Sequence, residues 1–141
     1  MGFIFQSFNL LGTMNAIENV ALPLTFRGVD KKIREAKAVE MLKLVGLPKH
    51  MKHRPNEMSG GQQQRVGVAR ALVLDPGIIF ADEPTGNLDH ETASQVFTSL
   101  LELAHTQGTA VVIVTHDREL ARRCDRAVEL KGGVIVDADR F

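Results

Sequence analysis

Two adjacent acids, Asp82 and Glu83, follow the apolar run at 78–81 in the segment GIIFADEP. Such a run is typical of a buried strand, and open α/β sheets bind ligands at the carboxyl ends of their strands. One carboxylate there can hold Mg²⁺, often through water, and another can polarise an attacking water. Because neighbouring strand residues point to opposite faces, we predict separate roles for the two acids. The alternative is a pair of solvated acids where a strand meets a loop.

Two further polar residues each follow an apolar run. His116 follows VVIVT, and Gln6 follows GFIF. An imidazole at the end of a buried strand can hydrogen-bond a γ-phosphate or a water, although it can equally cap the helix that is predicted after it. A neutral amide such as that of Gln6 can contact both a metal ion and a water.

The stretch SGGQ at 59–62 has the pattern of a helix N-terminus. Ser59 and Gln62 have the spacing of a capping box. A helix N-terminus offers free N–H groups and partial positive charge, and glycines let a phosphate approach the backbone closely. The alternative is an ordinary capped helix after a turn. The 141 residues contain no G-x-x-x-x-G-K-[ST] motif, so the usual phosphate-binding partner of such a helix is missing from this sequence.

The elements that must position these groups follow from hydrophobic periodicity and from capping residues. Strands are predicted at 2–5, at 78–81, at 109–116 (TAVVIVTH) and as a pair joined at Gly132-Gly133. Helices are predicted near 15–22, at 31–45, from Ser59 to Asp75, from Asp89 to Gly108 and in DRELARRC. Within 31–45, an apolar row of Ile33, Ala36, Val39, Leu42 and Val45 is predicted, with Asp30 as N-cap and Gly46 as the stop.

The order of these elements predicts an α/β protein. Strand and helix alternate in the second half, which indicates a parallel sheet, and the apolar strand at 109–116 is typical of one covered on both faces. The first half is predicted to form a helical lobe. We expect a first segment at 1–11, a helical subdomain at 12–74 and a core α/β subdomain at 75–141.

Composition narrows the possible functions. Lys plus Arg and Asp plus Glu both number 17, so the formal net charge of zero does not favour a general nucleic-acid binder. Cys124 is the single cysteine, so no intrachain disulfide can form. His50 and His53 have a spacing seen in metal sites, but no further ligand pair lies nearby in the sequence.

Gln6, SGGQQQR, IIFADEPTGNLD and VTHD occur in this order, and together they resemble the ATP-binding domain of ABC transporters, a P-loop NTPase fold, over essentially the whole chain. The matched positions are Gln6 for the Q-loop; Ser59, Gly60, Gly61 and Gln62 for the signature motif, with Met58 where leucine is usual; Asp82 for Walker B and Glu83 for the catalytic glutamate; Asn87, Leu88 and Asp89 for the D-loop; and His116 for the switch histidine. Short loops resemble one subgroup, the lipoprotein-releasing and macrolide-exporting ATPases.

The resemblance implies ATP and Mg²⁺ as cofactors and a head-to-tail dimer with a second ATP-binding subunit. It implies that Glu83 activates water, that Asp82 and Gln6 hold or sense Mg²⁺, and that His116 steadies the leaving phosphate. The signature residues would reach the γ-phosphate in the other subunit, and Asp89 would link the two sites. The helical lobe would receive integral membrane permease subunits, at the cytoplasmic face of the cell membrane.

The family's P-loop normally precedes the Q-loop, whereas this sequence begins almost at Gln6. We therefore expect a shortened form with exposed apolar edges, poor stability and no ATP hydrolysis alone. Two alternatives remain: the C-terminal lobe of a DNA-repair or chromosome-maintenance ATPase, and a non-catalytic fragment that docks to a partner.

Overall fold

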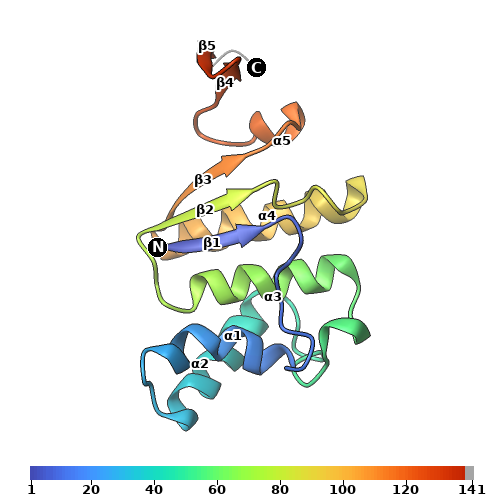
Figure 1. The fold of residues 1–141 in the computed structure, drawn as a ribbon, viewed down its shortest axis with the longest axis vertical. Coiled ribbons are helices and arrows are strands. Elements are labelled where there is room, and N and C mark those ends of the chain that lie inside the picture. The colour runs from blue at the N-terminus through green and yellow to red at the C-terminus, as the bar shows by residue number, and fades with distance from the viewer. Residues whose placement is uncertain (139–141) are drawn as a thin grey trace.

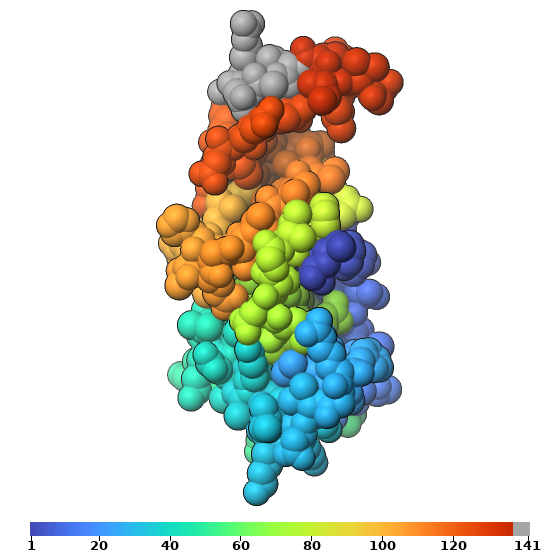
Figure 2. All heavy atoms as spheres, turned by 90° about the vertical axis from the view of Figure 1, so that its left-hand side faces the viewer, coloured from blue at the N-terminus to red at the C-terminus, as the bar shows by residue number. Residues whose placement is uncertain are grey.

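The computed structural model describes residues 1–138 of the chain. Its elements are β1 (Gly2–Phe5), α1 (Ala16–Phe26), α2 (Lys31–Leu44), a 3₁₀ turn (Pro55–Glu57), α3 (Gly60–Leu72), β2 (Ile78–Asp82), α4 (His90–Gln107), β3 (Ala110–Val114), α5 (Arg118–Ala121), β4 (Val128–Lys131) and β5 (Val134–Ala138). The molecule is elongated. The helical lobe of α1 and α2 lies at one end and the β4–β5 hairpin at the other (Figures 1 and 2).

The central layer is a parallel sheet in the order β1-β2-β3, which confirms the predicted α/β architecture. Gly2–Phe5 pairs in register with Ile79–Asp82, and Ile78–Asp82 pairs with Ala110–Val114. The strands β4 and β5 form a separate antiparallel pair, as the sequence predicts. Helix α4 covers one face of the sheet, and α3 connects that layer to the helical lobe (Figure 1).

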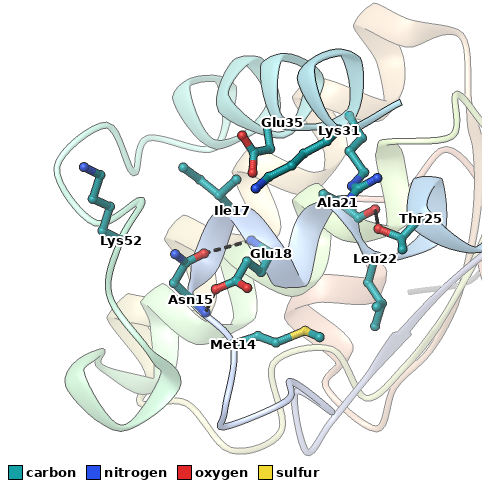
Figure 3. Close-up of a pocket in the computed structure, with 11 residues that line it drawn as sticks. Met14, Asn15, Ile17, Glu18, Ala21, Leu22, Thr25, Lys31, Glu35 and Lys52 are labelled. Atoms are coloured by element: carbon teal, nitrogen blue, oxygen red, sulfur yellow. Dashed lines mark hydrogen bonds between the residues drawn. The ribbon is translucent and has the colours of Figure 1, made fainter. Parts of the chain in front are cut away.

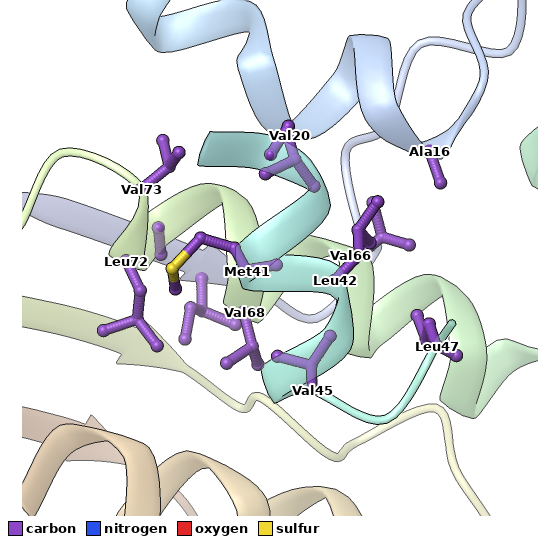
Figure 4. Packing of buried hydrophobic residues seen from close by; sticks show 14 of the residues in the cluster. Ala16, Val20, Met41, Leu42, Val45, Leu47, Val66, Val68, Leu72 and Val73 are labelled. Atoms are coloured by element: carbon purple, nitrogen blue, oxygen red, sulfur yellow. The ribbon is translucent and has the colours of Figure 1, made fainter. Parts of the chain in front are cut away.

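The core lies where α1, α2 and α3 meet. Val20, Leu42, Val66 and Leu72 are fully buried within one cluster (Figure 4). The same cluster includes Ile4 of the sheet, so buried apolar contacts run without a break from the helical lobe to the strands. The division into segments at 11/12 and 74/75 stays a prediction.

The capping pattern predicted for the longer helices is present at two of them, α3 and α4. Ser59 and Gln62 form a capping box at α3, Asp89 accepts a hydrogen bond from the Thr92 N–H at α4, and Gly108 ends α4 with a left-handed φ of 66°. Asp30 occupies the N-cap position of α2, as predicted, but its side chain makes no capping hydrogen bond.

The first helix is longer than predicted. It continues through Pro23 to Phe26, although proline in a helix interior loses a hydrogen bond and crowds the carbonyl four residues earlier. Tertiary contacts compensate, because Val20 and Leu24 are buried in the core on both sides of Pro23. The amide of Asn19 is fully buried and donates to the carbonyls of Leu11, Met14 and Asn15, which fixes the start of the helix.

The predicted apolar row of α2 is wrong at its first half. Ile33 is 63% exposed, and Ala36 is exposed as well. The buried face instead consists of Ala38, Met41, Leu42 and Val45. Both rows have helical spacing, and α1 and α3 contact the second, so contact with these helices decides which face is buried.

One face of the β1–β3 sheet is exposed in the described chain, contrary to the expectation that β3 is covered on both faces. Phe3, Phe80 and Val112 form one exposed row, and Phe5 and Val114 lie in the next row. The Phe3 ring stacks on those of Phe5 and Phe80 with centroid distances of 6.2 and 5.9 Å. This exposed apolar surface is a face of the sheet, whereas the sequence predicts exposed apolar edges.

The packing of α2 predicts that Leu42 and Ile33, two residues of the same predicted row, contribute differently to the free energy of unfolding. We expect Leu42→Ala to lower the free energy of unfolding by about 2–5 kcal/mol, because it leaves a cavity in the core. Ile33→Ala, the matched control, should change it by about 0.5 kcal/mol or less. Urea unfolding followed by circular dichroism measures both values. Equal destabilisation by the two variants would show that the buried face is assigned incorrectly.

Candidate functional site

The carboxyl ends of three parallel strands meet at one edge of the sheet. Phe5, Asp82 and Val114 are register partners across β1, β2 and β3. Gln6 and Glu83 directly follow the first two of these residues. The register therefore brings the polar residues predicted after the three strands to a single edge.

Glu83 and His116 form a hydrogen-bonded pair at this edge. The Nδ1 atom of His116 lies 2.7 Å from Oε1 of Glu83, and the backbone N–H of His116 donates to the same oxygen at 3.0 Å. The hydrogen bond and the negative charge of Glu83 raise the pKa of His116 above its ordinary value. The predicted alternative, that His116 caps the next helix, is wrong because the Asp117 side chain accepts from the first N–H groups of α5.

Glu83 reaches this position through an unusual backbone conformation. The strand β2 ends at Asp82, and Glu83 has a left-handed φ of 46°. The expectation that strand alternation separates the two acids is therefore wrong, because Glu83 is not a strand residue. The two carboxylates still differ in environment: Asp82 is exposed, whereas the Glu83 side chain is 22% exposed. A partly shielded carboxylate paired with an imidazole suits a general base.

Gln6 and Asn87 are joined by two hydrogen bonds. Asn87 Nδ2 donates to the backbone oxygen of Gln6 at 2.9 Å, and Gln6 Nε2 donates to Asn87 Oδ1 at 3.4 Å. A Cβ added at Gly86 would lie 2.5 Å from Gln6 Nε2, so only glycine lets the Gln6 amide lie across this loop. The segment after β1 and the loop after β2 are thus joined at the same edge.

The N-terminus of α3 lies at this end of the sheet, since a short loop returns the chain from α3 into β2 (Figure 1). The Ser59 side chain accepts from the Gln62 N–H at 3.2 Å, and Gln62 Oε1 accepts from the Ser59 N–H at 3.0 Å. Ser59 is exposed. Within residues 1–138, no hydrogen bond or ion pair joins Ser59 to Glu83 or His116.

The two glycines at the start of α3, Gly60 and Gly61, have a packing role. A Cβ at Gly60 would lie 3.2 Å from Leu88 Cδ2, and a Cβ at Gly61 would lie 2.4 Å from Thr92 Cγ2. Gly61 therefore allows α3 and the start of α4 to approach closely. The glycines are explained by contacts inside the chain, and their presence alone does not indicate a phosphate.

Asp82 and Gln6 are the residues predicted to hold Mg²⁺. In the described part of the chain, no group of three or more His, Cys, Asp or Glu side chains could hold a metal ion. Gln6 donates its amide nitrogen to Asn87, which leaves its side-chain oxygen available. One carboxylate and one amide oxygen fit Mg²⁺, which proteins commonly bind with one or two such groups while waters and substrate phosphates supply the others.

Sequence reasoning missed two side chains of α3 that contact the segments around this edge. Gln64 donates to the backbone oxygens of Phe5 and Pro84. Arg70 donates to the backbone oxygens of Phe8 and Asn9. A signal for Gln64 existed, because it lies four and eight residues before Val68 and Leu72 on the otherwise apolar face of this helix.

The fold and this edge define a class of protein: an α/β domain with acidic, amide and imidazole groups at the carboxyl ends of parallel strands and a capped helix N-terminus beside them. The family model for ABC transporters matches residues 1–86. The chain belongs to the ABC transporter family, and the described structure is part of its ATP-binding domain.

Similar proteins support this assignment. The chain is 50% identical over 135 residues to the lipoprotein-releasing system ATP-binding protein LolD of Novosphingobium aromaticivorans, covering 96% of this chain and 60% of that protein. It is 48% identical over 136 residues to the macrolide export ATP-binding/permease protein MacB of Chlorobaculum tepidum, covering 96% of this chain and 21% of that protein. The chain thus spans about 60% of the length of the LolD proteins that it matches.

Solved structures show the same fold. The dimeric, post-hydrolysis structure of the ATP-binding cassette MJ0796 with ADP and Pi matches with a TM-score of 0.83 and 43% identity, covering 99% of this chain and 62% of that one. A second dimeric structure of MJ0796 matches with a TM-score of 0.84. Among the described residues, no helix has the length and apolar character needed to cross a membrane.

The contact between Glu83 and His116 predicts a pH-dependent signal. We expect Glu83→Gln to lower the pKa of His116 toward the ordinary histidine value, as measured by NMR titration. The pKa of His116 is raised in the folded state. Its pairing with Glu83 therefore adds to the free energy of unfolding at low pH, and this contribution is lost as pH rises through the raised pKa. Glu119→Gln, which removes a carboxylate near His90 instead, is the control. An unchanged His116 pKa in Glu83→Gln would contradict the pairing.

Proposed function

We propose that this chain acts within an ATP-binding subunit of an ABC transporter of the lipoprotein-releasing or macrolide-exporting type. The observation that carries the proposal is the arrangement at one end of the sheet. Ser59, at the N-terminus of α3, is exposed there, and within residues 1–138 no hydrogen bond or ion pair joins it to Glu83 or His116. This separation is suited to a nucleotide site that is shared between two subunits.

In the proposed arrangement, the Ser59 hydroxyl and the N–H groups of Gly60 and Gly61 bind the γ-phosphate of ATP held by a second ATP-binding subunit. A helix N-terminus stabilises such an anion through its free N–H groups and its dipole. Gln62 supports this contact indirectly, because its side chain completes the capping box. The dimeric structures of the similar cassette MJ0796 support the expectation of a second subunit.

At the other half-site, we assign Glu83 as the general base that polarises water and His116 as its partner. His116 holds the Glu83 carboxylate by two hydrogen bonds to the same oxygen, one from its imidazole Nδ1 and one from its backbone N–H. Asp82 and Gln6 are the proposed Mg²⁺ ligands, direct or through water. Mg²⁺ would neutralise phosphate charge when bound. Asn87, Leu88 and Asp89 form the proposed D-loop, in which Asn87 connects to Gln6.

A membrane partner is proposed to bind the helical lobe. A cleft of about 610 Å³ lies between α1 and α2, with Met14, Ile17 and Leu22 beside the charged residues Lys31 and Glu35 (Figure 3). Apolar and charged groups side by side fit an amphipathic segment of a permease subunit. Binding there would hold the chain at the cytoplasmic face of the membrane. The similar LolD and MacB proteins favour this role over a DNA-maintenance ATPase.

We expect no ATP turnover by the purified chain alone. Its 141 residues do not contain the G-x-x-x-x-G-K-[ST] motif that holds the β- and γ-phosphates. Phosphate release above a protein-free blank is the measurement. Turnover that disappears in Glu83→Gln would contradict this expectation and would assign a complete site to the chain.

The shared site can be tested with full-length LolD of Novosphingobium aromaticivorans whose own signature serine is replaced. The wild-type chain should restore phosphate release. A chain with Ser59→Asp should restore roughly 10²-fold less, because aspartate preserves the helix cap but places a negative charge toward the γ-phosphate. Ser59→Thr keeps both the cap and the hydroxyl and is the matched control.

Circular dichroism first verifies that the three chains are folded. Equal phosphate release with the wild-type and Ser59→Asp chains would show that Ser59 does not act as a signature residue. If the folded wild-type chain restores no phosphate release, the proposal of a site shared in this way is wrong.

A further inference from the structure

Gln64 is a polar residue buried in the interior of α3. Its side chain is fully buried, on the same helical row as the buried Val68 and Leu72. Burying an amide is unfavourable unless its polar atoms find hydrogen-bond partners. The Oε1 atom of Gln64 has none in the described structure. The other contacts of this side chain must therefore account for its burial.

The explanation lies in the two acceptors of its nitrogen. Gln64 Nε2 donates to the backbone oxygen of Phe5 at 3.2 Å and also to the backbone oxygen of Pro84. Both acceptors are carbonyls, so the opposite amide orientation would place oxygen against oxygen. The two N–H groups of one amide therefore hold two backbone segments that are far apart in sequence.

These segments carry the residues assigned to the nucleotide site. Phe5 immediately precedes Gln6, and Pro84 immediately follows Glu83. Gln64 itself lies one turn after Gly60, in the helix that Ser59 caps. A single buried side chain thus links the first half of α3, the end of β1 and the loop after β2.

The backbone around these contacts needs such support. Phe8, Asn9 and Glu83 all have left-handed φ values, of 61°, 56° and 46°, which cost energy in residues other than glycine. Arg70 donates to the carbonyls of Phe8 and Asn9, so α3 holds the segment after β1 at two places.

We propose that Gln64 is a positioning residue that holds the backbone on either side of the nucleotide site, at Phe5 and at Pro84, in register with α3. A displacement of α3 is then transmitted to Gln6 and Glu83 together. The roles of Gln6 and Glu83 rest on the proposed function, whereas the link made by Gln64 does not.

The test uses hydrogen exchange of the folded chain, measured by mass spectrometry. Gln64→Met keeps the length of the side chain and removes both donors. We expect faster exchange, on the order of tenfold, in the segments 1–9 and 83–88 together, because each loses a buried hydrogen-bond donor. Segment 100–108, at the end of α4, should not change. Gln63→Met is the matched control, since Gln63 donates to Met58 instead.

A second variant separates hydrogen bonding from packing. Gln64→Glu introduces a carboxyl group of almost the same shape. When ionised, it has no donor and faces two carbonyl oxygens; when protonated, it regains one O–H donor. Because burial disfavours the charged form, the variant-to-wild-type ratio of exchange rates should fall toward one as pH is lowered. For Gln64→Met the ratio should be independent of pH.

Three outcomes overturn the proposal: unchanged exchange in Gln64→Met, faster exchange in only one of the two segments, or a Gln64→Glu effect that does not depend on pH. None of these measurements needs ATP. Failure of the Ser59 restoration assay would therefore reject the shared nucleotide site without deciding the role of Gln64, which hydrogen exchange decides independently.

Discussion

The parallel register of three short strands is the constraint on which the candidate site depends. Aligning Phe5, Asp82 and Val114 brings three distant parts of the chain to one edge. The short return from α3 into β2 then brings a helix N-terminus to the same end. A slip of one residue in either strand pair would exchange the buried and exposed sides of a strand and would also displace the polar residues that follow it.

The contacts around this edge change how strongly each sequence motif supports a functional site. The two glycines after Ser59 become weaker evidence for phosphate, because a Cβ at Gly61 would overlap Thr92 and one at Gly60 would lie 3.2 Å from Leu88 Cδ2. His116 becomes stronger evidence for a functional site, because it contacts Glu83 directly instead of capping the next helix. The strongest structural support for a functional edge is therefore an acid–imidazole pair.

Local patterns predicted local structure well. The capping box at Ser59 and the cap at Asp89 depend on neighbours three residues away, so the sequence contains the whole interaction. Features that depend on distant partners were not predictable in this way. The helix through Pro23 and the buried face of α2 are decided by packing between helices. The position of Gln64 on the apolar face of α3 indicates that it is buried, but it does not indicate the hydrogen bonds to segments 59 and 20 residues away.

The exposed face of the sheet has a consequence for how this chain behaves in solution. Three phenylalanines and two valines form a contiguous apolar surface on β1–β3. Such a surface promotes association between molecules unless something opposes it. Charge repulsion usually does so, but here the formal net charge is zero and the pI is about 7.0. Near neutral pH, the colloidal behaviour of the chain is therefore governed by its aromatic face, and a buffer well away from pH 7 is the physical remedy.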